Sequence, residues 1–471
     1  IGNSAGRTGL GAVMGAKNLK AIAVRGTRGI DIVHPETFFK LCLEAFETQK
    51  KLSPRVSTLS SAGDPDNNAL VLGNFEAGRW HKQDQLQGGH EPFWRTYKNR
   101  LGDGHLGCFN CRQRCMDYYD VPEAGPLVSN CSLYANSMWI LKDSDFNSWY
   151  RLASTCQKMG IDVISACRML AWATELYENG RISDVDTNGI QLRWGNSEAL
   201  HTMLDNIIHR KGLGAILASD IDTAVGSLGH DTPPPLHIKG SPLAGSNVIN
   251  FRARAIGAAV NPRGGDDYRM RWYGFEVPLT EDEDEPATMG GPESWEMEAA
   301  RKYLGYSQDK NNGNPKTQFD YANRGILAAT SAKMSIVTDI LGQCRLNTIQ
   351  LKKGVGINFQ ARALTAGTGS HFTVEDLLKY AERTACQEKA SAVKLGWTRA
   401  ADDLPKALFD RRMAGAWPED KLDPEQFRHM RAEYYQAMGW DPENGIPQLE
   451  TLRGLQLSDV AAELKKQDNF R

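Results

Sequence analysis

The chain has 471 residues, of which 41% are hydrophobic and 24% charged, and its net charge is −2. This composition is that of a globular protein long enough for two or three domains. A charge near zero offers no electrostatic basis for binding nucleic acid, and no apolar run is long enough to span a bilayer, so we expect neither as a partner. The cysteine count of nine is odd. Three of the nine are clustered and the others are scattered, which indicates a metal site in a reducing cytoplasm rather than a disulfide framework.

The first 30 residues are dense in glycine, start without Met and end in the apolar run "LKAIAV", which we expect to be a strand. We interpret residues 1–30 as the tail of a β-rich domain whose earlier part precedes this sequence. The run "GRTGLGAVMGAK" matches neither the phosphate-binding P-loop nor the G-x-G-x-x-G pattern. With Arg7 and Lys17 it would still let backbone amides approach a phosphate-bearing ligand; the alternative is a tight turn between strands.

The rest of the chain is expected to be mostly α-helical, in two domains. Apolar residues recur at three- and four-residue spacing in segments such as "SDFNSWYRLASTCQKMG" and "TVEDLLKYAERTACQEKASAVKLG". The segment "HDTPPPLHIKGSP" is the predicted linker, because three prolines exclude a helix. We therefore place one helical domain at 31–236 and another at 237–471. Residues 55–130 lack periodicity and are expected to be irregular loops that line a site.

Three cysteines in "CFNCRQRC" carry the clearest chemical signal. Cys108, Cys111 and Cys115 have the spacing C-x2-C-x3-C, which lets three thiolates converge on an iron–sulfur cluster with four ligands. Zinc is the alternative, but its sites usually pair two such knuckles and no second one is present. Buried core cysteines are the other alternative. For the fourth ligand the best candidate is Cys344 in "DILGQCRLN".

These motifs together resemble the aldehyde ferredoxin oxidoreductase family, which includes the tungsten subunit of class II benzoyl-CoA reductase. "GRTGLGAVMGAKNLKAIAVRG" is similar to the family signature R-x-G-L-G-A-V-M-G-S-K-x-L-K-A, and "CFNCRQRC" stands where its first three cluster cysteines stand. The family's two pterin motifs, D-x-x-G-L-D/C, have counterparts in "QKMGID", where Gln157 replaces the leading Asp, and in "DILGQC". The resemblance implies an α+β family fold whose N-terminal β domain is missing here.

The resemblance also implies the cofactors: tungsten held by two pterins, with molybdenum as an alternative metal, and one [4Fe-4S] cluster. Cys108, Cys111, Cys115 and Cys344 would hold the cluster. Asp162 and Asp339 would accept hydrogen bonds from pterin nitrogens, unless they are only helix caps or solvated acids. The full set of implied cofactor-binding residues is Arg7, Gly9, Gly11, Lys17, Asp162, Asp339, Gly342 and Arg345.

Two catalytic branches of the family are compatible with the sequence. In the first, an aldehyde is oxidised to a carboxylic acid. Glu123 lies near the position of that branch's glutamate, one residue out of register. Asp267 and its neighbour Asp266 stand where the branch has a histidine. An aspartate has a much lower ordinary pKa than histidine, so it would donate a proton at neutral pH only if buried or paired.

In the second branch an aromatic acyl-CoA is reduced. Cys131 occupies the position of that branch's tungsten-ligating cysteine; the alternative is a buried structural thiol. His81 follows the "NF" loop and is a candidate to reach the site, although such a histidine is more often on the surface. A third possibility is a non-catalytic electron-transfer subunit. The implied partners are ferredoxin or an iron–sulfur subunit, within an oligomer or complex.

Overall fold

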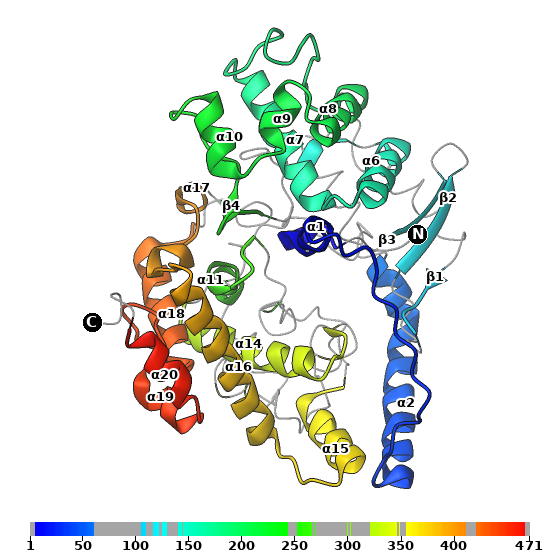
Figure 1. The fold of residues 1–471 in the computed structure, drawn as a ribbon, viewed down its shortest axis with the longest axis vertical. Coiled ribbons are helices and arrows are strands. Elements are labelled where there is room, and N and C mark those ends of the chain that lie inside the picture. The colour runs from blue at the N-terminus through cyan, green and yellow to red at the C-terminus, as the bar shows by residue number, and fades with distance from the viewer. Residues whose placement is uncertain are drawn as a thin grey trace, which may run out of the picture.

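The computed structural model shows a mostly helical chain, which confirms the predicted fold class (Figure 1). Within the described residues no helix is both long and apolar enough to cross a membrane. The described residues are 5–60, 105–109, 116–121, 125–129, 140–143, 145–243, 252–265, 269, 299, 302, 321–345, 348, 355–410 and 421–466.

The N-terminal segment is a short helix followed by a long exposed stretch. Helix η1 (Arg7–Gly9) continues into α1 (Leu10–Ala16), and the next helix is α2 (Pro35–Ser60). The strand predicted at "LKAIAV" is wrong in this structure: neither described sheet includes it, and Ile22 and Val24 are 71% and 90% exposed. A strand needs a neighbour to pair its backbone groups, and this run has none among the described strands.

A small antiparallel sheet follows, where the sequence was expected to be irregular. Its order is β1-β2-β3, and Tyr119 pairs with Leu127 across β2 and β3. Tyr119 and Val121 are buried, because alternate residues of a strand point to the same face. The prediction of loops throughout 55–130 is therefore wrong for these strands and for the end of α2. The strands are β1 (His105–Leu106), β2 (Met116–Val121) and β3 (Gly125–Ser129).

The first helical group has its starts encoded by side-chain caps. Asp145 accepts hydrogen bonds from the amides of Asn147 and Ser148 at the start of α6, and Asp162 accepts one from Ser165 at the start of α7. Trp172 of α7 lies in the shared core of this group, 1% exposed. The helices are α6 (Phe146–Met159), α7 (Val163–Glu178), α8 (Ser197–His209), α9 (Leu213–Leu217) and α10 (Ile221–Leu228).

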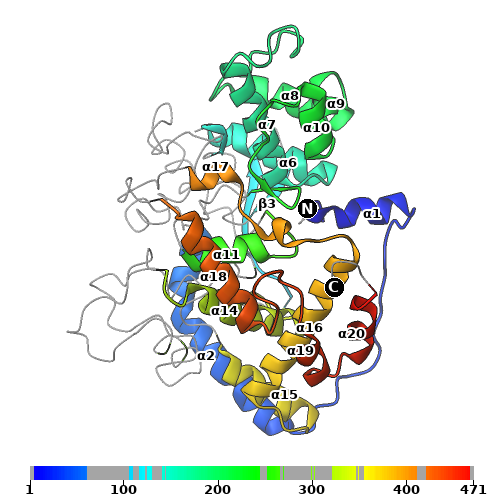
Figure 2. The same cartoon turned by 90° about the vertical axis from the view of Figure 1, so that its left-hand side faces the viewer.

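The second helical group packs around α14 and α16, with α18 against α14 (Figure 2). The hairpin β4–β5 precedes it, within the segment predicted to be a linker. Thr373 and Asp376 form a capping box at the start of α16. The elements are β4 (His237–Ile238), β5 (Ser241–Pro242), α11 (Arg252–Val260), α14 (Arg324–Ile340), α15 (Ile357–Thr368), α16 (Val374–Lys394), η8 (Arg399–Asp402), α17 (Lys406–Phe409), α18 (Pro424–Ala437), α19 (Leu449–Gly454) and α20 (Ser458–Leu464).

Two separate clusters of buried side chains underlie the two helical groups. One cluster extends from Ile140 to Ala224, and the other extends from Leu236 to Leu464. A domain is expected to have its own hydrophobic core. We therefore propose the division of the chain near residue 236, with the hairpin β4–β5 at the junction.

Candidate cofactor site

Two helices end in the same backbone geometry at the two glycine motifs. Gly160 ends α6 with a φ of 71°, and Gly342 follows α14 with a φ of 65°. Each glycine amide bonds to the carbonyl three residues earlier, Gln157 or Asp339, and the next amide bonds to the carbonyl five residues before it. This is the pattern of a helix closed by a left-handed residue, for which glycine has the lowest cost. The motifs "QKMGID" and "DILGQC" are therefore equivalent in structure as well as in spacing.

Arg7 joins the first of these motifs to the second half of the chain. Its Nη1 donates to Oδ2 of Asp162 at 3.0 Å, and Nη2 donates to the carbonyls of Pro242 at 3.2 Å and Gly265 at 2.9 Å. The side chains of Arg7 and Asp162 are each only 14% exposed. A planar guanidinium with fixed donor directions suits three acceptors in one arrangement.

Asp162 does two things at once. Oδ2 of Asp162 accepts hydrogen bonds from the amide and hydroxyl of Ser165 and from Arg7. Asp162 therefore caps α7, as the alternative interpretation predicted. Its other oxygen, Oδ1, accepts no hydrogen bond from the described part of the chain. A carboxylate oxygen with unused acceptor capacity, on a side chain that is only 14% exposed, fits the N–H groups of a pterin ring.

The N-terminal segment lies directly against the first motif. A Cβ atom on Gly6 would be 2.6 Å from the amide nitrogen of Asp162 and 3.0 Å from the carbonyl oxygen of Gly160. Only glycine allows backbones to approach this closely. Gly6 was not among the predicted site residues, although its position beside Arg7 was the available signal.

The other glycines and the lysine of this segment shape α1. Gly9 precedes α1 with a φ of 76°, where a left-handed residue is required, and a Cβ on Gly11 would be 3.0 Å from the carbonyl of Ala5. Lys17 caps the end of α1 through its backbone and is exposed. The alternative of a tight turn between strands is wrong, because the segment forms helices here. The role of Gly9, Gly11 and Lys17 in binding a cofactor remains a proposal.

At the second motif Asp339 pairs with two arginines. Nη2 of Arg345 lies 2.8 Å from each carboxylate oxygen, and Nε of Arg269 lies 3.3 Å from Oδ2. Arg269 also pairs with both oxygens of Glu388 on α16, and this pairing raises its pKa against the opposing effect of burial. The structure thus brings together Asp339 and Arg345, which were both predicted as cofactor-binding residues, and adds Arg269. Nothing local in the sequence distinguished Arg269 from the other arginines near it.

Helix α15 is held to the loop of the second motif. Nε2 of Gln360 donates to Oε1 of Gln343 at 2.7 Å. Gln343 follows Gly342 and precedes Cys344, whose side chain is exposed. This contact fixes the backbone on which the predicted fourth cluster ligand stands.

The described cysteines differ in exposure, and Cys42 is intermediate. Cys108 and Cys344 are exposed, whereas Cys156, Cys167 and Cys386 are buried. Burial raises the pKa of the Cys156 thiol to about 12 and that of Cys386 to about 11, so neither is a ready thiolate. Cys111, Cys115 and Cys131 lie outside the described residues. Among the residues that are described, no group of three metal-ligating side chains occurs.

The three predicted catalytic residues also lie outside the described part of the chain. Glu123 is the second residue after the end of β2, and Asp267 precedes Arg269 by two positions. His81 lies between α2 and β1 in the sequence. Their roles therefore stay predictions.

Another cluster contains a serine, a histidine and an aspartate, the residue types of a hydrolytic triad, but their hydrogen bonds run in a different order. The hydroxyl of Ser148 donates to buried Asp143 and lies 3.1 Å from Nε2 of His201, while Ser197 donates to the same aspartate at 3.1 Å. In a nucleophile triad the histidine lies between serine and carboxylate. Here the serine is in the middle, so the cluster links α8 to the residues before α6 and has no activated nucleophile.

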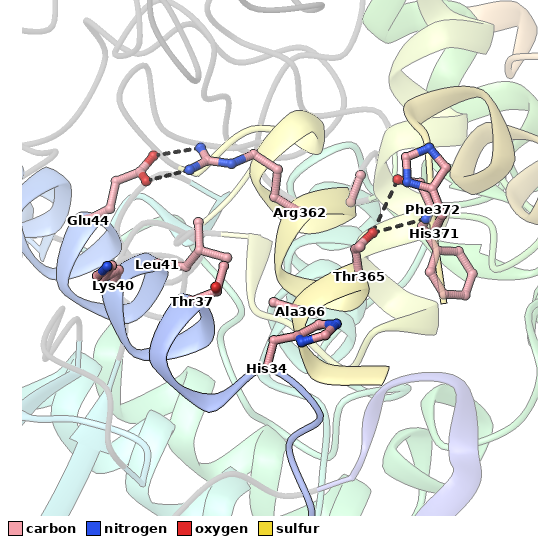
Figure 3. Close-up of a pocket in the computed structure, with 11 residues that line it drawn as sticks. His34, Thr37, Lys40, Leu41, Glu44, Arg362, Thr365, Ala366, His371 and Phe372 are labelled. Carbon is pink, nitrogen blue, oxygen red and sulfur yellow. Dashed lines mark hydrogen bonds and ion pairs between the residues drawn. The ribbon is translucent and has the colours of Figure 1, made fainter. Parts of the chain in front are cut away.

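A groove of about 440 Å³ lies between α2 and α15 (Figure 3). Arg362 spans one end of it and pairs with both oxygens of Glu44 at 3.0 Å. None of the predicted site residues lines this groove, so it is distinct from the paired motifs. Its lining residues are His34, Thr37, Lys40, Leu41, Glu44, Ala361, Arg362, Thr365, Ala366, His371 and Phe372.

The fold matches that of a solved protein chain. The structure aligns with a chain of the active site complex BamBC of benzoyl coenzyme A reductase, solved in complex with 1,5-dienoyl-CoA. The TM-score is 0.75 at 20% identity, and the alignment covers 98% of this chain and 71% of that one. The likeness establishes the fold.

A family model and several relatives identify the family itself. The model for "Aldehyde ferredoxin oxidoreductase, domains 2 & 3" matches residues 59–457. The chain therefore belongs to the aldehyde ferredoxin oxidoreductase family, as its motifs predicted. It is 28% identical to a tungsten-containing aldehyde ferredoxin oxidoreductase of Pyrococcus furiosus and 27% identical to that of Thermococcus kodakarensis, over 94% of this chain and 68% of each relative. An aliphatic sulfonate oxidoreductase, WOR-like subunit, of Pyrococcus furiosus is 22% identical over 98% of this chain and 68% of its own length.

Proposed function

We propose that this chain forms the larger part of a tungsten–pterin oxidoreductase that oxidises an aldehyde to a carboxylic acid and passes electrons to ferredoxin or a partner subunit. The observation that carries the proposal is the repeated helix end, with an arginine-bound aspartate at each motif. Asp162 with Arg7, and Asp339 with Arg345, offer one carboxylate and one guanidinium to each of two pterins. The tungsten-containing relatives support the metal.

The proposed chemistry divides between the bound groups and the protein. When bound, tungsten held by pterin sulfurs supplies two-electron chemistry at the substrate, and a [4Fe-4S] cluster supplies one-electron transfer. The carboxylates of Asp162 and Asp339 would accept hydrogen bonds from pterin ring nitrogens and orient the rings. The arginines balance the charge of those carboxylates and would also balance the charge of pterin phosphates.

We further propose the cluster ligands Cys108, Cys111, Cys115 and Cys344. Exposed Cys108 and Cys344 differ in the expected direction from the buried thiols, since a ligand has to be accessible as a thiolate. Gln360 steadies the loop of Cys344 through its bond to Gln343.

Proton transfer is assigned to the predicted acids. We propose Glu123 as the base toward an aldehyde hydrate and Asp267 as the second proton-handling group, with His81 within reach of the substrate. Aspartate in place of histidine requires burial or a paired carboxylate to hold a proton near neutral pH.

An alternative function is reduction of an aromatic acyl-CoA, favoured by Cys131 in the role of a tungsten ligand. A non-catalytic electron-transfer subunit is the alternative of another class. Metal analysis of the purified native protein for tungsten, molybdenum and iron is the first test, followed by turnover of aldehydes and of aryl-CoA thioesters with a viologen dye. Tungsten with about four irons per chain and aldehyde turnover is the expected result.

The remaining outcomes discriminate the alternatives. Turnover of aryl-CoA thioesters alone would establish the ring-reductase function. Iron without tungsten or molybdenum would identify an electron-transfer subunit, and no iron would overturn the cluster. The variant Cys344→Ser should lose iron, whereas the matched control Cys386→Ser, at a buried thiol bonded by Trp440, should retain it.

A further inference from the structure

The hairpin β4–β5 turns through a residue that rarely adopts the required conformation. Lys239 and Gly240 form its two-residue turn with φ values of 54° and 72°. Positive φ at both central residues is the favoured hairpin geometry, usually met by Asn-Gly or Asp-Gly. A lysine there is strained, and such strain persists only when surrounding contacts hold it.

The side chain of Lys239 makes those contacts in the second helical group. Its Nζ donates to the carbonyl of Ala259 at the end of α11 and lies 3.0 Å from Oδ1 of Asp402. Asp402 is completely buried. One ammonium therefore joins the hairpin, the negative end of α11 and a buried carboxylate.

Asp402 is also held by groups that do not belong to the hairpin. Lys389 lies 2.7 Å from Oδ2, the hydroxyl of Tyr435 donates to the same oxygen at 2.9 Å, and the indole of Trp397 donates to Oδ1 at 3.1 Å. The carboxylate is thus fixed in place by the C-terminal helices. Because Asp402 is held in place, its ion pair with Lys239 also holds the hairpin in place.

The hairpin and the turn after α11 supply the carbonyls that orient Arg7. Nη2 of Arg7 donates to Pro242 of the hairpin and to Gly265 of that turn. The two elements are in close backbone contact: a Cβ on Gly264 would be 2.3 Å from the carbonyl oxygen of Ile238. Lys239 links the two elements, because its backbone is part of the hairpin and its side chain binds the carbonyl of Ala259 at the end of α11.

We propose that Lys239 is a positioning residue for the first pterin motif, which sets the direction of Arg7 and through it the orientation of Asp162. The path is Lys239 to the hairpin, the Pro242 and Gly265 carbonyls to Arg7, and Arg7 to Asp162. Its consequence for the cofactor rests on the proposed function; the placement of Arg7 does not.

Lys389 provides a matched control for a merely structural ion pair. It carries the same charge, binds the same carboxylate and is also largely buried, at 6% side-chain exposure against 13% for Lys239. Only Lys239 belongs to the hairpin. The variants Lys239→Met and Lys389→Met should both lower stability, but only the first should disturb Arg7.

The test is hydrogen exchange on the purified full chain, followed by mass spectrometry of peptides that cover 5–11, 160–165 and 236–243. In Lys239→Met, exchange in all three should be about tenfold faster than in the wild type, as expected when a charge-assisted hydrogen bond holding a segment is lost. Lys389→Met should leave 5–11 and 160–165 at wild-type rates. Lys239→Arg, which keeps the charge, should restore them.

Wild-type exchange at 5–11 in Lys239→Met, or an equal change in Lys389→Met, would overturn the proposal. If Lys239→Met does not fold, Lys239→Gln decides on the same criteria. Pterin and tungsten content provide the second readout: a severalfold loss in Lys239→Met, with no further loss when Arg7→Ala is added, is expected for two residues acting on one path. Altered exchange with no pterin in the wild type would retain the positioning role and reject the proposed cofactor.

Discussion

Gly160 and Gly342 end helices α6 and α14 in the same left-handed conformation, in separate helical groups. Each is followed within two residues by a side chain predicted to face the cofactor, Asp162 in the first motif and Cys344 in the second. The repeated backbone therefore presents different chemistry at its two copies: a carboxylate for a pterin and a thiol for a cluster. The carboxylate of the second copy, Asp339, comes from the last turn of its helix instead.

These two glycines should be equally sensitive to alanine. A Cβ would meet no atom within 4 Å at Gly160 or at Gly342, so the cost is that of a left-handed alanine alone. We expect each Gly→Ala variant to lose about 1 kcal/mol of unfolding free energy in urea titrations. Gly367→Ala is the control, because Gly367 is inside α15 with ordinary contacts 3.7 Å away, and alanine should stabilise that helix. A loss well above 2 kcal/mol would mean that steric clashes contribute.

Gly6→Ala should impair the first motif more than it impairs stability. Gly6 has an ordinary helical φ of −74°, so alanine is allowed there, but its Cβ would clash with the backbone of Asp162. The exposed N-terminal segment should move away and take Arg7 with it. We expect pterin content to fall severalfold while the urea midpoint stays nearly unchanged. Gly15→Ala in α1 meets no atom within 4 Å and should retain full cofactor; equal losses in both variants would contradict the close approach.

The cysteines should react with iodoacetamide in two classes at pH 8. Cys108 and Cys344 are exposed and should be modified within minutes in iron-free protein. Cys156 and Cys386 are buried, and their raised pKa values of about 12 and about 11 keep them as thiols. Peptide mapping by mass spectrometry measures both classes. Protection of Cys108 and Cys344 by iron and sulfide would support their role as ligands, whereas rapid labelling in iron-loaded protein would exclude it.

Lys389 should make stability depend on pH in the alkaline range. Burial lowers its pKa from 10.5 to about 8, against the opposing attraction of Asp402. The penalty for burying the charged form is complete below pH 8. Between about pH 8 and 10.5 the unfolded chain binds a proton that the native state has released, so this group adds stability as pH rises.

The measurement is the difference in unfolding free energy between wild type and Lys389→Met from pH 7 to 10. This difference should grow with pH in favour of the wild type. The variant is subtracted from the wild type because both contain buried Tyr434, Tyr435 and Cys386. Their raised pKa values make the native state less stable as pH rises. A flat difference would indicate that Lys389 keeps an ordinary pKa.

The sequence by itself determined the helices and the family. Apolar residues at three- and four-residue spacing lie within a single segment, so local periodicity was enough to predict α6 and α16. Their caps, Asp145 and Thr373, likewise act on amides only two or three residues away. The glycine and cysteine motifs could also be identified, because each lies within one short stretch of sequence. A left-handed helix end at Gly160 is encoded by the glycine alone.

Only the tertiary structure decided which charged side chains meet their distant partners. Arg7 with Pro242 and Gly265, Arg269 with Asp339 and Glu388, and Lys239 with Asp402 join residues from distant parts of the chain. The run "LKAIAV" has the composition of a strand but no neighbour here to complete its hydrogen bonds. Such contacts depend on how whole helices pack, because an ion pair or a strand pairing gains free energy only once both partners are already brought together.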